Sequence, residues 1–391
     1  MPRFPVAAVL LVLVSLGLLT VAWLGSDEEE GTAAQGEATA GDGSGVPLSI
    51  PEYSAAAEAG IETGAVILMY HRFGRDEFAS TSVRMEQFED HLEYLEEAEF
   101  NIWPLERVVR YLQEGRTFPD RTVAITIDDA YPTVYENAFP EFRERGWPYT
   151  VFVSTDGPDG GGQSYMNWDQ LREMAEESEA RFANHSATHD YLVQRREGES
   201  EADWEERVRA DIGKAEERLH EELAGHVADD PPLHAYPYGE YDAELRRIVD
   251  DMGYVALGQH SGPVGAHSDH LALPRFAMAE NYADPNDFRL RVHTRPMPLK
   301  GMEPNDPVHI DEENPPRMVL TLEEGAVDIG RMNCFAGPRD VVLERDPGPP
   351  PRVSVQATEP LPQGRSRYNC TLPAAGGGFH WYSFQWIKGR R

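Results

Sequence analysis

The feature that most constrains the fold of this chain is an apolar run that ends in two adjacent carboxylates. Residues 123–131 read V-A-I-T-I-D-D-A-Y, and Thr126 is the only polar residue before Asp128. Such a run is typical of a strand that is covered on both faces, as in a parallel sheet flanked by helices. Ionised carboxylates at the edge of an apolar core are costly unless they are hydrogen-bonded, paired with cations or bound to a metal. An isolated Asp-Asp pair can also lie in a solvated turn, so the rest of the sequence is needed to choose between these two interpretations.

Apolar runs and segments with helical spacing alternate through the middle of the chain. The runs that we interpret as strands lie at residues 65–71, 100–105, 123–128, 149–154, 180–183, 233–236 and 254–257. This order predicts a parallel sheet that is closed or nearly closed, and we expect a distorted (β/α) barrel of seven or eight strands over residues 63–297.

Short strand-like runs without helices follow the expected barrel. They are separated by Pro and Gly clusters such as D-P-G-P-P-P, which predicts a small all-β, sandwich-like domain over residues 298–391. Tyr382, Phe384 and Trp386 alternate along one of these runs. We interpret them as an aromatic core stripe, with stacking on sugars as the alternative.

The beginning of the chain predicts export. Residues 5–24 form a nearly unbroken apolar run behind Arg3, without a clear small-residue cleavage site. We interpret residues 1–25 as an uncleaved signal-anchor, with a cleaved signal peptide as the alternative, and residues 26–62 as a disordered acidic linker. The body is then expected on the periplasmic side of the inner membrane, held by a single pass, or secreted if the segment is cleaved.

Charge and cysteine content limit the partners and the compartment. The formal net charge of −33 argues against nucleic acid and anionic membrane surfaces as partners, so membrane contact is expected through the N-terminal segment only. Cys334 and Cys370 are the two cysteines of the chain. They could pair in an oxidising compartment and would be small core residues in a reducing one.

Polar side chains gather where the expected strands end. The carboxyl ends of barrel strands meet at one rim, which places there His71, Asp128, Asp129, His185 and His189. If His185 and His189 begin a helical turn, their i,i+4 spacing puts both imidazoles on one face, as shared metal ligation requires. One carboxylate would complete a metal site with open positions, and the other could take a proton from water. The pattern predicts metal-assisted hydrolysis.

Three motifs in this order resemble a known family. T-I-D-D-A at residues 126–130, H-S-A-T-H at 185–189 and Y-P-Y-G at 236–239 are similar to the motifs of polysaccharide deacetylases of the NodB-homology type, carbohydrate esterase family 4. The opening L-M-Y-H-R-F looks most like the branch that acts on poly-β-1,6-N-acetylglucosamine. The resemblance covers roughly residues 65–297. It implies a metal-dependent hydrolase of the cell envelope that removes N-acetyl groups from an N-acetylhexosamine polysaccharide.

The resemblance also implies roles for individual residues. Asp128 would be the general base, and Asp129, His185 and His189 would bind zinc or another divalent ion. A backbone N–H beside Ala130 or Tyr131 would help to hold the oxyanion. The predicted wall of the substrate groove consists of Tyr236, Pro237 and Tyr238.

Three points depart from the family pattern. Ala130 replaces the usual Gly, which is tolerable if its φ is negative. Many members have an Arg shortly before the Pro of the third motif to hold the base, whereas this chain has His234 there. No late motif supplies the general acid, for which we select His71, with His260 as the alternative. A catalytically inactive glycan-binding envelope protein on the same barrel is the rival interpretation.

Overall fold

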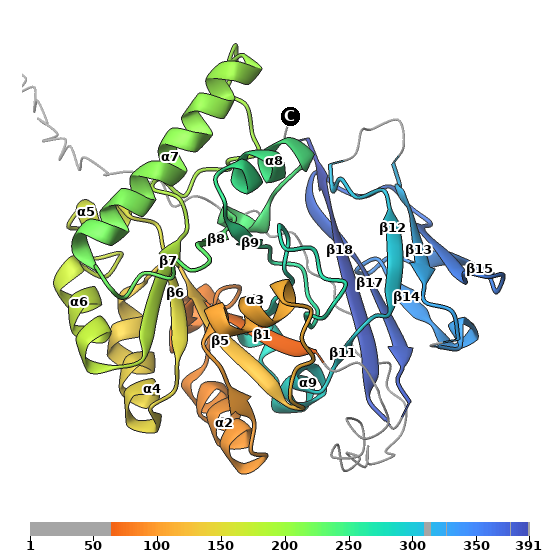
Figure 1. The fold of residues 1–391 in the computed structure, drawn as a ribbon, viewed down its shortest axis with the longest axis horizontal. Helices are drawn as coiled ribbons and strands as arrows, with labels where there is room; N and C mark the ends of the chain where they lie inside the picture. The colour runs from red at the N-terminus through yellow and green to blue at the C-terminus, as the bar shows by residue number, and fades with distance from the viewer. Residues whose placement is uncertain (1–63, 309–313, 326, 376, 390–391) are drawn as a thin grey trace, which may run out of the picture. The chain divides into compact units, whose positions relative to one another are not determined.

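The carboxylate-ended run forms an inner strand of a parallel sheet in the computed structural model, which describes residues 64–308, 314–325, 327–375 and 377–389 (Figure 1). All pairings in this sheet are parallel. From one edge of the sheet to the other, the strands are β10 (Phe276–Ala277), β1 (Ala65–Tyr70), β5 (Thr122–Asp128), β6 (Tyr149–Val153), β7 (Ala180–Asn184), β8 (Leu233–Ala235) and β9 (Val255–Leu257). A further strand, β4 (Asn101–Ile102), also pairs with β5.

Helices that connect or follow these strands cover the outside of the sheet (Figure 1). They are α2 (Met85–Glu97), α3 (Leu105–Gln113), α4 (Phe139–Arg145), α5 (Asp156–Asp159), α6 (Trp168–Glu177), α7 (Glu201–Glu222), α8 (Ala243–Asp251) and α9 (Pro285–Val292). In α3, the buried residues Leu105, Val108, Val109 and Leu112 recur at helical spacing, so one face packs on the sheet. A π-helical turn, Val134–Ala138, directly precedes α4.

One short segment closes the sheet. The N–H of Leu273 donates to the carbonyl of Ala256 beside β9, at 2.9 Å. Three residues later, Phe276 pairs with Leu68 of β1 in parallel register. Residues 273–277 therefore contact both edges of the sheet, which confirms the expected distorted barrel.

Two further sheets of four strands each follow the barrel. The strand order of the first sheet is β11 (Arg295–Pro296), β18 (Phe379–Lys388), β17 (Gly364–Pro373) and β14 (Asn333–Phe335). The strand order of the second sheet is β12 (Leu299–Glu303), β13 (Arg317–Leu322), β16 (Arg352–Ala357) and β15 (Val341–Asp346). Side chains from both sheets form one apolar core, as Leu320, Val355 and Trp386 illustrate. We call strands β12–β18 the C-terminal sandwich.

The aromatic stripe of the last strand belongs to this core. Phe384 and Trp386 are 5% and 1% exposed, which confirms the core interpretation over sugar stacking for these two side chains. A disulfide between Cys334 and Cys370 joins β14 to β17.

The expected signal-anchor and acidic linker lie outside the described residues. Within the described part of the chain, no helix is long and apolar enough to cross a membrane. The described residues all belong to one compact unit, and a domain boundary at residue 298 stays a prediction.

Candidate metal and catalytic site

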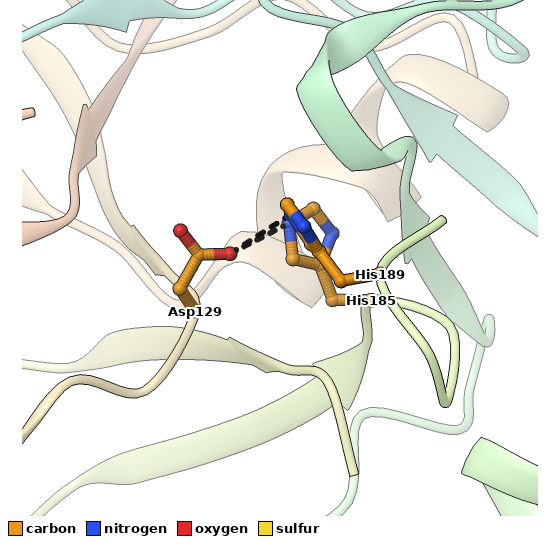
Figure 2. Close-up of side chains that lie close together, drawn as sticks. All are labelled: Asp129, His185 and His189. Carbon is orange, nitrogen blue, oxygen red and sulfur yellow. Dashed lines mark ion pairs between the residues drawn. The ribbon is translucent and has the colours of Figure 1, made fainter. Parts of the chain in front are cut away.

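Asp129, His185 and His189 converge at the rim of the barrel. The Oδ1 atom of Asp129 lies 3.3 Å from Nε2 of His185 and 3.1 Å from Nε2 of His189 (Figure 2). One ligand atom from each residue lies within 4.8 Å of the others. Three donors at this separation can hold one ion between them.

The chemistry of these donors fits a divalent metal. Oδ1 of Asp129 and Nε2 of His185 are buried, and neither has a hydrogen-bond partner among the described residues. Buried polar atoms are rarely left unpaired unless an ion or water completes them. His185 Nδ1–H donates to the carbonyl of Ala235 at 2.7 Å, so its Nε2 lone pair faces Asp129. Two imidazoles and one carboxylate suit zinc and several other divalent ions, and leave positions open for water and substrate.

A loop, not a helix, brings the two histidines together. His185 follows directly after β7, and both Ser186 and His189 have positive φ, at 62° and 60°. The backbone N–H of His189 donates to Ser186 Oγ at 3.0 Å, and that of Ser186 donates to Asn184 Oδ1 at 2.9 Å. The expectation of a helical turn was therefore wrong, because side-chain hydrogen bonds fold the loop so that the two rings still meet.

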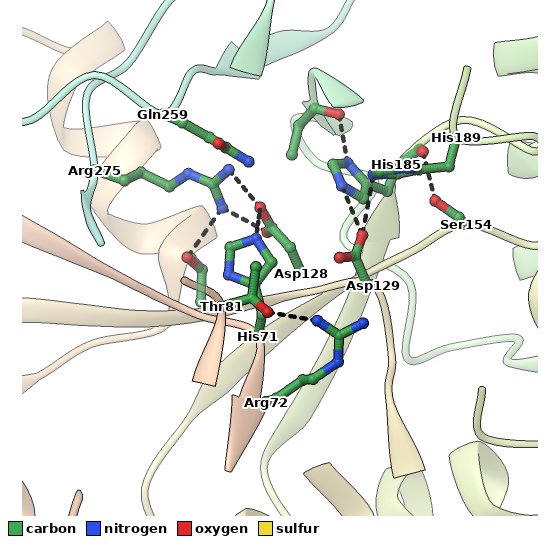
Figure 3. Close-up of polar contacts among 12 residues, drawn as sticks. His71, Arg72, Thr81, Asp128, Asp129, Ser154, His185, His189, Gln259 and Arg275 are labelled. Carbon is green, nitrogen blue, oxygen red and sulfur yellow. Dashed lines mark hydrogen bonds and ion pairs between the residues drawn. The ribbon is translucent and has the colours of Figure 1, made fainter. Parts of the chain in front are cut away.

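Arg275 holds Asp128 from across the barrel. Its Nη1 and Nη2 donate to Oδ1 and Oδ2 of Asp128 at 2.7 and 2.8 Å (Figure 3). Both side chains are fully buried. Nη1 also donates to Thr126 Oγ1 at 3.2 Å, and Nε donates to the carbonyl of Gly258 at 2.9 Å. Sequence reasoning left Asp128 without a cation, whereas the structure provides one just before β10.

The surroundings keep both carboxylates ionised. Burial alone would raise the pKa of Asp128, but Arg275, His185 and His71 together hold that pKa below its usual range. Burial acts in the same way on Asp129, and the two histidines beside it outweigh burial, so its pKa is well below the usual range. Asp128 is thus available to accept a proton at neutral pH.

Of the two histidines considered as general acid, His71 faces Asp128. Nε2 of His71 lies 3.9 Å from Oδ2 of Asp128, and Figure 3 shows its ring directed toward that carboxylate. His260 is buried instead, and burial, with nearby Arg367 and Arg275, lowers its pKa to about 3. Its carbonyl accepts the backbone N–H of Arg275 at 2.9 Å. A histidine that stays neutral at this depth is poorly suited to donate a proton.

Ala130 occupies a left-handed conformation. Its φ is 55°, next to 75° for Asp129, so the condition of a negative φ is not met. Left-handed geometry costs an L-residue roughly 1–2 kcal/mol. The surroundings hold it in place, because Ala130 is fully buried and its carbonyl accepts the N–H of Met166 at 2.9 Å. The strain falls directly after Asp129, one of the three candidate ligands, and strained residues are often found at functional sites.

The residues of the predicted groove wall lie in different environments. Tyr236 is fully buried and its hydroxyl donates to the carbonyl of Leu271 at 3.0 Å, and Pro237 is buried beside it. Their side chains are therefore not open to a glycan. Tyr238 is half-buried and stacks on Tyr191 with ring centroids 3.8 Å apart, and its ring lies 4.5 Å from that of His189.

Sequence reasoning missed a second stack on the rim. The guanidinium of Arg72 lies 3.6 Å from the ring centroid of Tyr131 and 4.3 Å from that of Phe78. Tyr131 in turn stacks on Tyr165, with centroids 5.6 Å apart. Phe78 is 41% exposed. The available signal was the R-F that follows the first strand, together with Tyr131 directly after the Asp-Asp pair.

Comparison with known proteins gives a consistent result. Residues 115–257 match the polysaccharide deacetylase family. The poly-beta-1,6-N-acetyl-D-glucosamine N-deacetylase of Staphylococcus epidermidis is 29% identical over 242 residues, which span 56% of this chain and 81% of that protein. Its counterpart in Staphylococcus aureus (strain MRSA252) is 24% identical over 240 residues, spanning 56% and 80%.

A solved structure shares the fold of the barrel. The Streptococcus pyogenes deacetylase PplD, determined in complex with acetate, superposes with a TM-score of 0.52 at 21% identity. The match covers 59% of this chain and 99% of PplD. The likeness therefore supports the barrel fold.

Proposed function

Because the barrel belongs to the polysaccharide deacetylase family, we propose that this protein is a metal-dependent hydrolase that removes N-acetyl groups from an N-acetylhexosamine polysaccharide. One observation carries the proposal. A three-residue ligand set lies beside a carboxylate that a buried Arg275 holds ionised. A protein that only binds glycans requires neither, so the rival interpretation leaves both unexplained.

Asp128 is the general base in this reaction. A divalent ion, with zinc as the first candidate, held by Asp129, His185 and His189 would supply Lewis acidity to the acetyl carbonyl and acidify water. Arg275 uses both carboxylate oxygens of Asp128, but each oxygen keeps a lone pair for a further hydrogen bond. Asp128 takes the proton from the attacking water as the new C–O bond forms.

His71 is the general acid. Its Nε2 lies 3.9 Å from Oδ2 of Asp128, so the acid and the base can both reach one small acyl group. When the C–N bond breaks, the bonding pair goes to nitrogen and His71 supplies the proton that makes the free amine. Acetate leaves, and proton exchange between Asp128, His71 and solvent restores the starting state.

Backbone and aromatic groups position the sugar. A backbone N–H beside Ala130 or Tyr131 helps to hold the oxyanion, because the left-handed turn there lies next to Asp129. Tyr238 forms one wall of the groove beside His189, and the Tyr131–Arg72–Phe78 stack forms a second contact surface. Rings fixed in this way lose little freedom when a glycan binds.

We propose poly-N-acetylglucosamine as the polymer. Two relatives that match over four-fifths of their length carry the name poly-beta-1,6-N-acetyl-D-glucosamine N-deacetylase. The sequence L-M-Y-H-R-F, which provides His71 and Arg72, supports the same branch.

We also propose that the protein works outside the cytoplasm, anchored by its N-terminal segment on the periplasmic side of the inner membrane. The disulfide between Cys334 and Cys370 supports export, because such bonds persist in oxidising compartments.

Acetate release from three purified glycans tests the polymer. We expect faster release from β-1,6-linked N-acetylglucosamine oligomers than from chitin oligomers or peptidoglycan glycan strands at equal N-acetyl concentration. Equal or faster release from either of the other two would reject poly-N-acetylglucosamine while keeping the hydrolase.

A further inference from the structure

We propose that the C-terminal sandwich takes part in catalysis through Arg367, a positioning residue on β17. Arg367 holds residues 258–261 in place, so that Arg275 keeps its two hydrogen bonds to Asp128. This inference rests on the proposed function, because it assigns the sandwich a task in the same reaction. It concerns residues outside the matched motifs.

The strand pair β17–β18 presents a different chemistry on each face. Side chains alternate along a strand. On one face, Tyr368, Cys370 and Trp386 lie in the sandwich core. The opposite face carries Arg365, Arg367 and Asn369 of β17 and Trp381 and Gln385 of β18, and all five side chains form hydrogen bonds to the barrel.

Most of these bonds end on one loop of the barrel, which follows β9. Arg367 Nη2 donates to the carbonyl of Gln259 at 2.6 Å, and Arg365 Nη1 donates to Oε1 of the same residue at 2.9 Å. Two residues further on, Ser261 Oγ accepts from Trp381 Nε1 at 3.0 Å. Bonds from charged donors are the stronger ones, so Arg367 is the principal restraint on the loop backbone.

The same loop holds Arg275. The carbonyl of Gly258 accepts from Arg275 Nε at 2.9 Å, and the carbonyl of His260 accepts from the backbone N–H of Arg275 at 2.9 Å. The carbonyl between them, on Gln259, accepts from Arg367. Of these three successive carbonyls, the outer two thus accept hydrogen bonds from Arg275, which holds Asp128. The middle one accepts from Arg367 of the sandwich.

A second contact joins the sandwich to the turn that carries Tyr238. Gln385 is fully buried, and its Nε2 donates to the carbonyl of Gly239 at 2.8 Å. Gly239 has φ +68°, and a Cβ there would lie 2.5 Å from Cβ of Gln259. The two loops therefore pack directly on each other, and the sandwich restrains both.

Loss of this restraint should affect the chemical step more than substrate binding. The paired hydrogen bonds between Arg275 and Asp128 require that the plane of the guanidinium is fixed. The carbonyl of Gly258 helps to fix it by accepting from Nε, the third nitrogen of the guanidinium. Misplacement of a reacting group by about 1 Å can cost about 100-fold in rate. Because Arg275 keeps its other partners when Arg367 is lost, we expect a smaller effect of about tenfold on kcat.

The test compares three variants of the full chain. Arg367→Met removes the bond to Gln259, and Arg367→Lys keeps a charged donor at the same position. Arg345→Met is the matched control, because Arg345 donates to the carbonyls of Ile329 and Met332 within the C-terminal sandwich. For Arg367→Met we expect kcat to fall about tenfold with KM and metal affinity unchanged. Arg367→Lys should recover most of this loss, and Arg345→Met should keep wild-type kcat.

Hydrogen exchange at the amides of Gly258 and Arg275 provides a readout that needs no turnover. Both amides should exchange faster in Arg367→Met than in Arg345→Met, because their loop is less restrained. Equal exchange in these two variants, or equal kcat, would overturn the inference. If wild type releases no acetate from any glycan, the proposed function fails, and the exchange comparison still decides whether the sandwich restrains Arg275.

Discussion

Arg275 and Asp128 form two hydrogen bonds of 2.7 and 2.8 Å although 147 positions separate them in the sequence. Both side chains are fully buried, so the pair is protected from solvent. The guanidinium fixes the plane of the carboxylate and favours its ionised form. The pair thus fixes the orientation and charge of Asp128, the proposed base, from a position outside the segment before Pro237.

Replacing Arg275 should change how activity depends on pH. In Arg275→Met, burial of Asp128 is no longer offset by the guanidinium, so its pKa rises. Asp128 then becomes protonated at a higher pH than in wild type. The acidic limb of kcat/KM should therefore shift to higher pH. We also expect roughly 100-fold lower kcat at neutral pH from the misoriented base.

The matched variant for this test is Arg275→Lys. It keeps the positive charge but not the two-pronged geometry, so its acidic limb should move less than that of Arg275→Met while its kcat still falls. An Arg275→Met enzyme with the wild-type acidic limb would contradict the role given to this pair.

Two substitutions should separate the proposed base from the proposed metal ligands. Asp128→Asn should lower kcat at least about 100-fold and leave metal content unchanged, because Asp128 is outside the ligand set. His185→Ala should lose both metal and activity. Metal analysis after gel filtration, with exposed His267→Ala as the control, measures this difference. An active His185→Ala enzyme would reject the ligand assignment.

Relief of the strained turn should stabilise the protein. Ala130→Gly should raise the free energy of unfolding by roughly 0.5–1 kcal/mol, because Gly adopts φ near 55° without the Cβ clash. Urea denaturation measures the change. Ala175→Gly, at a buried position inside α6, should instead lower the free energy by about 1 kcal/mol. A loss of similar size in both variants would show that Ala130 is not strained.

His91 should make stability depend on pH. Its ring is stacked on Phe288 at 3.8 Å, and its Nε2–H donates to the carbonyl of Ala283 at 3.0 Å. Burial lowers its pKa from 6.5 to about 4. The unfolded chain therefore binds the extra proton between about pH 6.5 and pH 4, and stability falls as the pH falls through this window.

Denaturation at pH 7 and pH 5 tests this effect. His91 should account for about 2 kcal/mol of the loss over this interval, and the loss should be smaller by that amount in His91→Gln. The same pH dependence in wild type and His91→Gln would contradict the assignment.

The residues of the candidate site were predictable where the signal is local. Asp128, Asp129 and His185 each stand at the end of an apolar run, and strand ends in a parallel barrel meet at one rim. The role of His71 was open from sequence, and its distance to Asp128 supports it over His260.

Other features depend on information that the local sequence does not contain. Arg275 precedes a strand of only two residues, and its partner lies in a distant strand. The i,i+4 spacing of His185 and His189 is equally compatible with a loop that has two positive φ angles. Thr126 offered one overlooked signal, because its hydroxyl is the polar exception in the apolar run and accepts from Arg275.

The most direct test of the account is acetate release by the purified full chain from β-1,6-linked N-acetylglucosamine oligomers, with and without chelator and with zinc added back. We predict release that chelator abolishes and a divalent metal restores, because the ligand set of Asp129, His185 and His189 supplies the only proposed Lewis-acid site. Release that persists after complete metal removal would contradict metal-assisted hydrolysis. The absence of release from metal-loaded, folded protein on every N-acetylated glycan would contradict the proposed enzyme itself.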